Sequence, residues 1–547
     1  MQQTDNPIGV ENRFQYFDAY FTDNWKVAQN LVLNLGLRYD IPFTLSVHDS
    51  INGVHVASSF EPDVPNPGAN NIPGALVYQG TGNFTCNCNR LTNTRYVMWQ
   101  PRVGLAYKLD DKTVIHAGYG MYISINGSTN GNGFGQVADG FDATVSTSSP
   151  SPGTGTPAFT TAGGYPKFTP PPFINSTFDN FSGTTWVPKG TGLPGVINDW
   201  TLSIQRQLPK GFLLDVSYVG NTAQHIASGL DNPEQLPISD QIQYGAALNA
   251  QLNSVAGIAT GVQAPFPDFI ADLGGNATVG QALRRFPQYT GINEIKQNNG
   301  HSNYNSLQAR LQRQFHDGLS VLTSFTWAKQ MSTAEDELSQ FNDGPQDTYG
   351  RQGEYTVALD QPPLNLTVTY DYQLPIGYEK KWLNHGIAAT LLGGWAVAGI
   401  HHYQSGTALF ETSTGSNLSI FNDILRPNYV PGVPEKAHWS GKFNPHIDAY
   451  INSAAFTAPA PNSFGNVSRD LPLRGTAYLD EDLSARKDFH IYKESSLQFR
   501  SDFFNAFNRS QLIDIFTNTS WGTTGFGTDA HQGNQPRTIQ FSLKALF

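Results

Sequence analysis

The chain has 547 residues, enough for one large domain or for about three ordinary ones. Its net charge of −11 and the lack of a basic cluster argue against nucleic acid as a partner, and no apolar run approaches the roughly 18 residues of a membrane-spanning helix. Charged residues make up only 14% of the chain and aromatic residues 12%, with 53 glycines and 34 prolines, a composition typical of large β surfaces joined by loops.

The clearest predicted element is a strand over 31–40. Leucines at 31, 33, 35 and 37 and Tyr39 alternate with Asn34, Gly36, Arg38 and Asp40. A helix would scatter these leucines around its axis, whereas a strand places all of them on one face. The length matches the roughly 9–11 residues of a tilted strand that crosses a bilayer.

The same alternation recurs in chain order and mostly in pairs. We predict about 13 strands, whose alternating cores lie at 17–21, 31–40, 103–109, 115–123, 200–208, 212–218, 307–315, 319–327, 364–372, 395–397, 483–485, 497–503 and 539–547. The last strand has no partner next to it in the sequence.

The connections alternate between two sizes. Within a pair the turn has from two to about a dozen residues, whereas the gaps between pairs are long: 41–100, 124–197, 221–302, 329–361, 406–477 and 509–535. Bacterial outer-membrane β-barrels have short turns on the periplasmic side and long loops outside. The sequence therefore predicts an all-β fold, an antiparallel transmembrane β-barrel portion in the outer membrane. A soluble stacked sheet is the alternative.

Charge placement predicts which face meets lipid. The polar faces carry the candidate lumen-facing residues Arg38, His116, Asp215, Arg310, Asp371, Arg500 and Asp502, together with Lys544. The charges noted on the apolar faces are Arg206, Arg313 and Lys487, each within about two residues of a short turn. There we expect them to extend to the interface, where a lipid-facing charge costs little.

No motif for catalysis, a cofactor or a metal is evident, so we expect no enzyme and no cofactor. His401 and His402 are adjacent and should point to opposite faces of a strand, which disfavours a shared metal. The acidic run 333–347 either holds a cation or, as we favour, is a solvated loop. Cys86 and Cys88 are interpreted as loop residues, and the sequence leaves open whether they form a local disulfide.

Several segments resemble TonB-dependent outer-membrane transporters, specifically the Oar-like branch with very large barrels. They are FDAYFTDNWKVAQNLVLNLGLRYD (17–40), PRVGLAYKLDDKTVIHAGYG (101–120), NYNSLQARLQRQFHDGLSVLTSFTWAK (303–329), LQFRSDFFNAFNRS (497–510) and RTIQFSLKALF (537–547). The resemblance implies a barrel of ~22 strands with a plugged lumen. It also implies that Phe541, Leu543 and Phe547 form the C-terminal signal read by the barrel-insertion machinery.

The resemblance further implies that residues 1–547 are the C-terminal part of such a barrel. Residues 1–14 have neither a basic start nor an apolar core, so the signal peptide is expected upstream, with the plug and roughly the first nine of ~22 strands. The implied partners are outer-membrane lipid, the insertion machinery and, through the missing region only, the inner-membrane TonB complex.

The expected function is uptake of an unknown solute. The first alternative is a structural or adhesive outer-membrane protein whose long loops bind extracellular partners. A secreted carbohydrate-binding module is a second, but it would carry charges in mid-strand.

Overall fold

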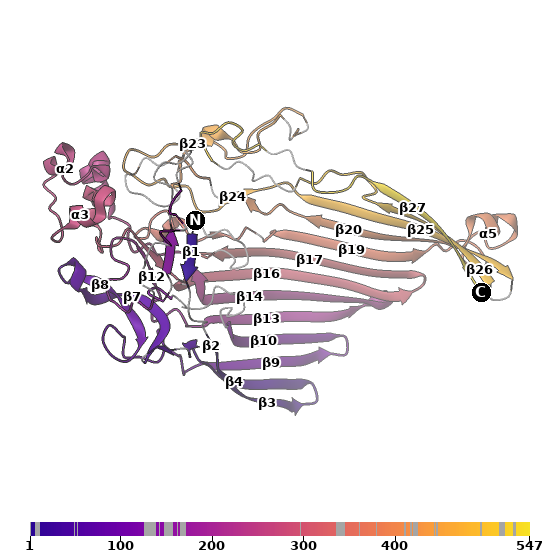
Figure 1. The fold of residues 1–547 in the computed structure, drawn as a ribbon. Coiled ribbons are helices and arrows are strands. Elements are labelled where there is room, and N and C mark those ends of the chain that lie inside the picture. The colour runs from indigo at the N-terminus through magenta and orange to yellow at the C-terminus, as the bar shows by residue number, and fades with distance from the viewer. Residues whose placement is uncertain are drawn as a thin grey trace.

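The structure is a computed structural model, and one antiparallel sheet dominates it (Figure 1). It describes residues 2–5, 11–48, 50–51, 53–124, 138–141, 143–146, 157–160, 162–164, 171–295, 297–334, 345–359, 361–378, 380–409, 412–415, 418, 425–441, 443–444, 447–492, 495–512, 520–528 and 532–547. Within these residues, no helix is long and apolar enough to cross a membrane.

The sheet has 14 strands among the described residues, in the order β27-β26-β25-β20-β19-β17-β16-β14-β13-β10-β9-β4-β3, with β18 paired to β17. Their bounds are β3 (Tyr16–Ala28), β4 (Leu31–Pro42), β9 (Trp99–Asp110), β10 (Thr113–Ser124), β13 (Gly195–Leu208), β14 (Phe212–Ser228), β16 (Gln297–His316), β17 (Leu319–Ser332), β18 (Thr356–Val357), β19 (Leu364–Gln373), β20 (Trp395–Gln404), β25 (Tyr478–Tyr492), β26 (Ser495–Phe504) and β27 (Thr538–Leu546). Every predicted strand is present, and the all-β prediction is confirmed.

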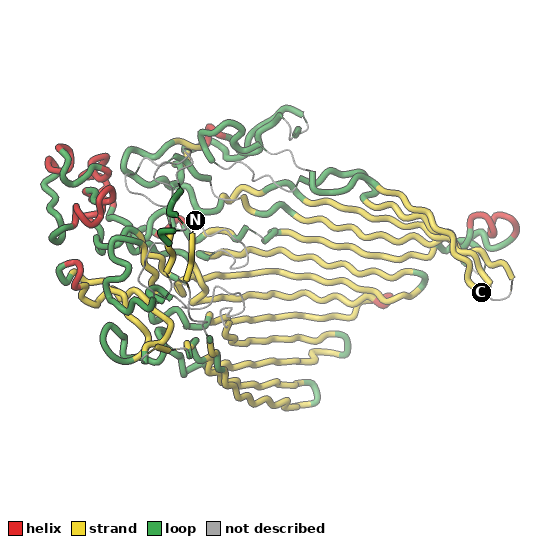
Figure 2. The backbone as a smooth tube through the Cα atoms, viewed as in Figure 1, coloured by secondary structure: helices red, strands yellow, loops and turns green. Residues whose placement is uncertain are grey.

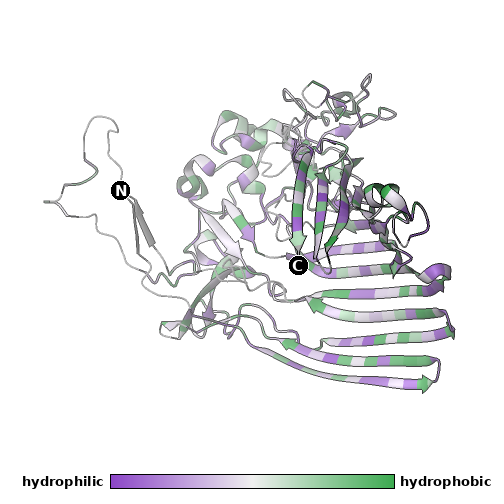
Figure 3. Cartoon of the chain, turned by 90° about the vertical axis from the view of Figure 1, so that its right-hand side faces the viewer, coloured by the Kyte–Doolittle hydropathy of each residue, from purple (hydrophilic) through white to green (hydrophobic). Residues whose placement is uncertain are grey.

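The sheet is a single layer, and among the described residues most of its apolar face is not covered by protein. Exposed fractions are 69% for Phe21, 51% for Leu202, 60% for Trp327 and 67% for Phe541. Figure 3 shows the alternation of hydrophobic and hydrophilic residues along the strands. An apolar surface that spans so many strands is far larger than a soluble monomer exposes, so lipid must cover it.

The long connections gather at one end of the sheet, and their described residues form a second body, here called the loop layer (the described residues within 43–98, 125–194, 229–296, 333–363, 405–477 and 505–537) (Figures 1 and 2). Its strands are β5 (Ser46–Val47), β6 (Ser50–Ile51), β7 (Val54–Asn66), β8 (Ile72–Gly80), β11 (Ala143–Ser146), β12 (Gly183–Trp186), β15 (Gly291–Glu294), β21 (Ala408–Leu409), β22 (Asn428–Tyr429), β23 (Phe456–Thr457) and β24 (Leu471–Arg474), with β1 (Gln2–Asp5) and β2 (Asn12–Arg13) paired to β11 and β5. Its helices are η1 (Pro67–Ala69), α1 (Ile238–Tyr244), η3 (Gly245–Asn249), α2 (Val255–Ala259), α3 (Phe269–Leu273), η4 (Gly274–Asn276), α4 (Val279–Leu283), η5 (Arg351–Gly353) and η6 (Ser453–Ala455).

The hydrophobic cores of the described chain lie in this loop layer. One surrounds Leu248 and Phe269, a second Ile451 and Leu471, a third Leu76 and Tyr78, and a fourth Phe60 and Tyr289. The sheet itself contributes little buried apolar surface, because its apolar side chains face outward. The loop layer is therefore the part of the molecule that folds as a water-soluble protein does.

The opposite end of the sheet carries the short connections. The turn of β13 and β14 is η2 (Pro209–Gly211), and Asp317 and Gly318 join β16 to β17. The connection of β19 to β20 is longer than the dozen residues expected, because residues 374–394 include the helix α5 (Gly386–Leu392). The turn of β25 and β26 includes residues outside the described part of the chain.

The two edge strands of the sheet run in the same direction. Among the described residues, β3 pairs only with β4 and β27 only with β26. The sheet twists strongly, so that strands beside the C-terminus lie at a steep angle to those at the other edge (Figure 3). Within the described residues it is an open sheet with two unpaired edges.

Candidate functional site on the polar face

The pairing register places all the predicted polar candidates on one face of the sheet. Arg38 lies opposite Gln100, His116 opposite Ser203, and Asp215 opposite Arg310. Farther along, Arg486 lies opposite Arg500, and Ser484 opposite Asp502. Residues opposite each other in a ladder share a face, so this face is continuous across the sheet.

Part of this face is hollowed, and four of the predicted residues line the hollow. The hollow has a volume of about 520 Å³ and lies over β16, β17, β19, β20, β25 and β26. Its lining includes Arg310 and Asp371 and, from β26, Arg500 and Asp502. Strands far apart in the sequence thus bring charges of both signs to one place.

Most of the charges around the hollow are paired. Arg486 donates to both carboxylate oxygens of Asp371, at 2.9 and 3.2 Å. Arg500 Nε donates to Asp502 Oδ1 at 2.8 Å and to Ser484 Oγ at 3.2 Å. The paired groups stay partly exposed, so they form a charged wall that a polar solute can reach, and a structural role as mutually satisfied wall charges fits equally well.

Arg486 was missed by the sequence reasoning, although a signal for it was present. It directly follows Ala485, which points to the apolar face. Because successive side chains alternate, Arg486 points to the polar face. Its pairing with Asp371 could not be predicted, because the two residues are separated by β20 in the sheet.

The remaining candidates lie away from the hollow. Arg38 pairs with Asp40 at 2.7 Å and with Asp18 at 3.4 Å near the β3 edge. Asp215 accepts a hydrogen bond from Gln205 at 3.5 Å, and no ion pair joins it to Arg310 in the described part of the chain. His116 is exposed on β10.

The charges on the apolar face only partly follow the prediction. Arg206 is exposed beside its turn, but Arg313 and Lys487 are buried instead of extending to water. Asp23 and Glu481 also belong to this face, because they lie opposite Leu35 and His401. Glu481 pairs with Arg509 at 2.9 Å, whereas nothing in the described structure explains Asp23.

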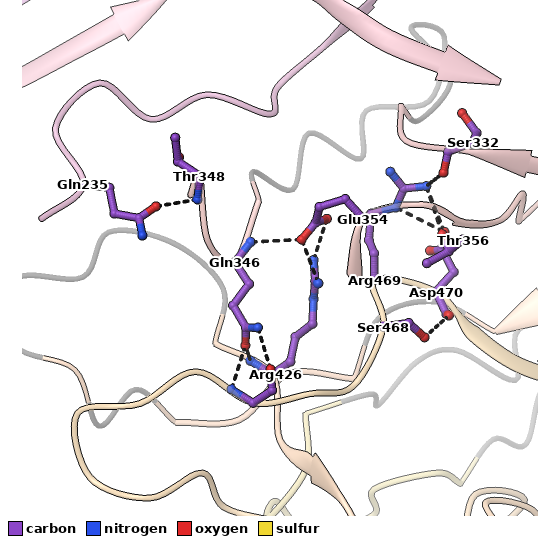
Figure 4. A network of polar contacts seen from close by, with 11 residues as sticks. Gln235, Ser332, Gln346, Thr348, Glu354, Thr356, Arg426, Ser468, Arg469 and Asp470 are labelled. Atoms are coloured by element: carbon purple, nitrogen blue, oxygen red, sulfur yellow. Dashed lines mark hydrogen bonds and ion pairs between the residues drawn. The ribbon is translucent and has the colours of Figure 1, made fainter. Parts of the chain in front are cut away.

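A buried polar network ties three long connections of the loop layer together (Figure 4). Arg426 donates to both carboxylate oxygens of Glu354, at 2.8 and 2.9 Å, and both side chains are almost fully buried. Gln346 bonds to the backbone of Arg426, and Gln235 bonds to the backbone N–H of Thr348 at 2.7 Å. Such a network fixes the positions of the connections, and no local pattern could have predicted pairs so distant in sequence.

The histidines, cysteines and acidic residues considered for a metal site or a disulfide lie in separate places. His401 stacks on Tyr370 and His402 lies near Tyr478, on opposite faces as predicted. A disulfide joins Cys86 and Cys88, which the sequence had left open. Over the described residues no group of three or more His, Cys, Asp or Glu side chains is placed to hold a metal. Most of the acidic run 333–347 lies outside the described residues.

A single-layer antiparallel sheet with one lipid-compatible face, short turns at one end and long loops at the other defines an outer-membrane β-barrel protein. The model of the outer membrane beta barrel domain family matches residues 1–540, so the chain belongs to this family and resides in the outer membrane. A search of curated proteins found no match.

Solved structures with a similar course of the chain are outer-membrane receptors and transporters. The pyoverdine receptor FpvA of Pseudomonas aeruginosa PAO1 is 12% identical with a TM-score of 0.39, covering 98% of this chain and 42% of that one. The transporter YddB of Escherichia coli is 11% identical with a TM-score of 0.39, covering 98% of this chain and 54% of that one. The ferric-catecholate receptor Fiu of E. coli K12 is 11% identical with a TM-score of 0.38, covering 98% and 45%. The chain thus spans only about half the length of these proteins or less.

Proposed function

We propose that residues 1–547 are the C-terminal part of a TonB-dependent transporter that takes up a solute across the outer membrane. The observation that carries the proposal is the continuous polar face with its hollow, opposite a face that only lipid can cover. In a closed barrel this face lines the lumen, with Arg38, His116, Asp215, Arg310, Asp371, Arg500 and Asp502 as wall residues. The resemblance of the five segments to Oar-like transporters supports it.

The proposal assigns the signal peptide, the plug and the first strands to a region upstream of this chain. The open edge of β3 supports this assignment, because in lipid each unpaired backbone group costs several kcal/mol. The inner-membrane TonB complex then acts only through that region. Among the residues proposed to guide insertion, Phe541 and Phe547 are 67% and 99% exposed, and Leu543 is 65% exposed, all accessible to a protein that reads the strand.

The test is uptake by cells that express the parent protein as their single transporter of this type. A panel of labelled ferric chelates, oligosaccharides and cobalamin is offered with and without an active TonB complex. We expect TonB-dependent accumulation of at least one solute. Reversing the charge at position 371 with Asp371→Arg should lower that uptake. Lys108→Glu, a charge reversal at an exposed position beside a turn, should not. Surface binding without accumulation, unchanged by loss of TonB, would contradict the proposal.

One observation favours a second function, adhesion: the loop layer has a packed structure of its own. Its own hydrophobic cores and the Glu354–Arg426 network make a rigid extracellular surface, which suits adhesion to a partner as well as capture of a solute. In that case the parent protein binds other cells or matrix, and loss of TonB changes nothing.

A further inference from the structure

The connection between β19 and β20 differs from the tight turns at the short-turn end of the sheet. The described residues of the segment 374–394 contain α5, and Figure 1 shows α5 beyond the ends of the strands, near the C-terminus. The sequence of α5, GIAATLL, has no charged residue. A tight turn would suffice to join the strands, so the helix calls for a separate explanation.

Lys487 shows on which side of the sheet α5 lies. It lies opposite Trp395 in the register of β20 and β25. Its side chain points to the same side as those of Ala485 and Val397, which is the apolar face. Its ammonium group donates to the backbone oxygens of Thr390 and Leu391, at 2.9 and 2.6 Å. The last turn of α5 thus covers the apolar face, and its carbonyl groups compensate the buried charge.

Two aromatic rings complete the cover over this lysine. Its ammonium lies 5.5 Å from the ring centre of Trp395 and 4.9 Å from that of Phe489. Lys487 is only 3% exposed, so its side chain does not extend to water. It instead attaches the helix to the sheet.

The outer surface of α5 is apolar and uncovered. Ile387 is 79% exposed and Leu391 64%, and the two lie one turn apart on the side opposite Ala389, the buried residue of the helix. Trp382 and Tyr378 in the preceding segment are 55% and 60% exposed. The helix therefore turns its apolar side away from the protein, beside a face that lipid already covers.

Two basic residues precede α5 in the same connection, next to Trp382. Lys380 and Lys381 are exposed, and the Lys381 ammonium lies 5.4 Å from the ring centre of Trp382. Lysine with an aromatic ring is the combination that anchors protein at the level of lipid headgroups, where phosphate groups accept from ammonium groups.

We propose that α5 is an interfacial helix that embeds Ile387 and Leu391 in the periplasmic leaflet of the outer membrane, with Lys380 and Lys381 at the phospholipid phosphates. The inference rests on the proposed orientation, in which short turns face the periplasm. The occupant is phospholipid because Lys487, on the lipid-facing side of the β20 and β25 pair, holds the last turn of α5 against that side.

The test is depth-dependent quenching of a fluorophore on the native protein. An Ile387→Cys variant is labelled with a small maleimide dye, to which the bonded Cys86 and Cys88 do not react, and is reconstituted with phospholipids brominated on the acyl chains. Val255→Cys, at a position 89% exposed in the loop layer, is the matched control. We expect brominated lipid to quench roughly half of the emission at 387 and almost none at 255, with the reverse for aqueous iodide.

A third label separates the two proposals. Leu202→Cys lies on the apolar face in mid-strand and reports on the barrel itself. Quenching by lipid at 202 together with quenching by iodide at 387 overturns the interfacial helix while leaving the barrel intact. Absence of lipid quenching at both 202 and 387 shows that the assignment of the lipid-facing side of the sheet is wrong. Protection of 387 from both quenchers indicates protein cover and also overturns the proposal.

Discussion

At the scale of residues, the sequence predicts best the face of the sheet to which each side chain points. The apolar face of Leu31 and Leu33 and the polar face of Arg38 follow directly from the alternation, because successive side chains on a strand point to opposite sides. The partners of a charge do not follow. Lys487 was expected to reach water, yet α5 covers it, since a helix from a distant part of the chain supplies the carbonyl groups.

A matched pair of arginine substitutions tests parity. Leu202→Arg places a charge on the lipid side of β13, at a cost of about 2–4 kcal/mol near mid-bilayer, whereas Thr201→Arg places it on the polar face. We expect the first to reduce folded protein in outer membranes several-fold and the second to leave it unchanged, as measured by heat-modifiable migration. Leu35 is a poorer position, because Asp23 lies opposite and would pair with the new arginine. Equal assembly of the two variants would refute the assigned faces.

A buried ion pair gives a second residue-scale prediction. Arg426→Ala leaves the Glu354 carboxylate buried without its partner, which typically costs about 3–5 kcal/mol. We expect protease added to intact cells to cut residues 345–359 and 425–441 faster in this variant. Arg13→Ala, which breaks an exposed pair with Glu11, should change cleavage little, because such pairs contribute about 0–1 kcal/mol. Equal resistance of both variants would show that the network does not hold the loops.

At the scale of elements, the strands of the sheet were predictable and the loop layer was not. Each long strand carries its own signal in the alternation of its residues. The strands β7 and β8 and the helices α1 to α4 form around buried residues such as Phe269 and Tyr78, whose contacts come from several connections. Packing between distant segments overrides local propensity there, so the sequence shows only long gaps.

The loop layer contains a carboxylic acid whose titration should be visible. Glu294 ends β15, and burial raises its pKa to about 7. Because the folded-state pKa lies above the unfolded value, the stabilisation is complete below the unfolded pKa, near 4.5, and is lost as the pH rises toward 7. We expect the amide protons of β12 and β15 to exchange more slowly at pH 5 than at pH 8, after correction for the intrinsic rate.

Glu294→Gln is the control for this effect. Burial also raises the pKa of Glu61 and Glu234, so the wild type alone would not isolate one group. The glutamine variant should lose the part of the pH dependence that belongs to Glu294 and should gain protection at pH 8. An identical pH profile in both proteins would show that Glu294 is not responsible.

At the scale of the whole molecule, the strand count and the connection lengths come from the sequence, whereas closure does not. The alternation of turns and loops predicted which end of the sheet holds the loop layer, and the structure confirms it. The hollow and its four predicted lining residues depend on the curvature and twist of the sheet, which no single strand determines.

Our last prediction is that residues 1–547 alone do not form a closed transporting barrel. β3 and β27 run in the same direction, so they cannot make the antiparallel closure usual in these barrels, and each would leave a row of unpaired backbone groups in lipid. Expressed behind a signal peptide, the chain should aggregate or stay open, and co-expression of the upstream region should restore a heat-modifiable barrel. The matched control is the parent protein in one piece. A monomeric, heat-modifiable product from residues 1–547 alone that accumulates a solute would disprove the prediction. Misassembly that the upstream region does not correct would instead point to a defect unrelated to the open edges.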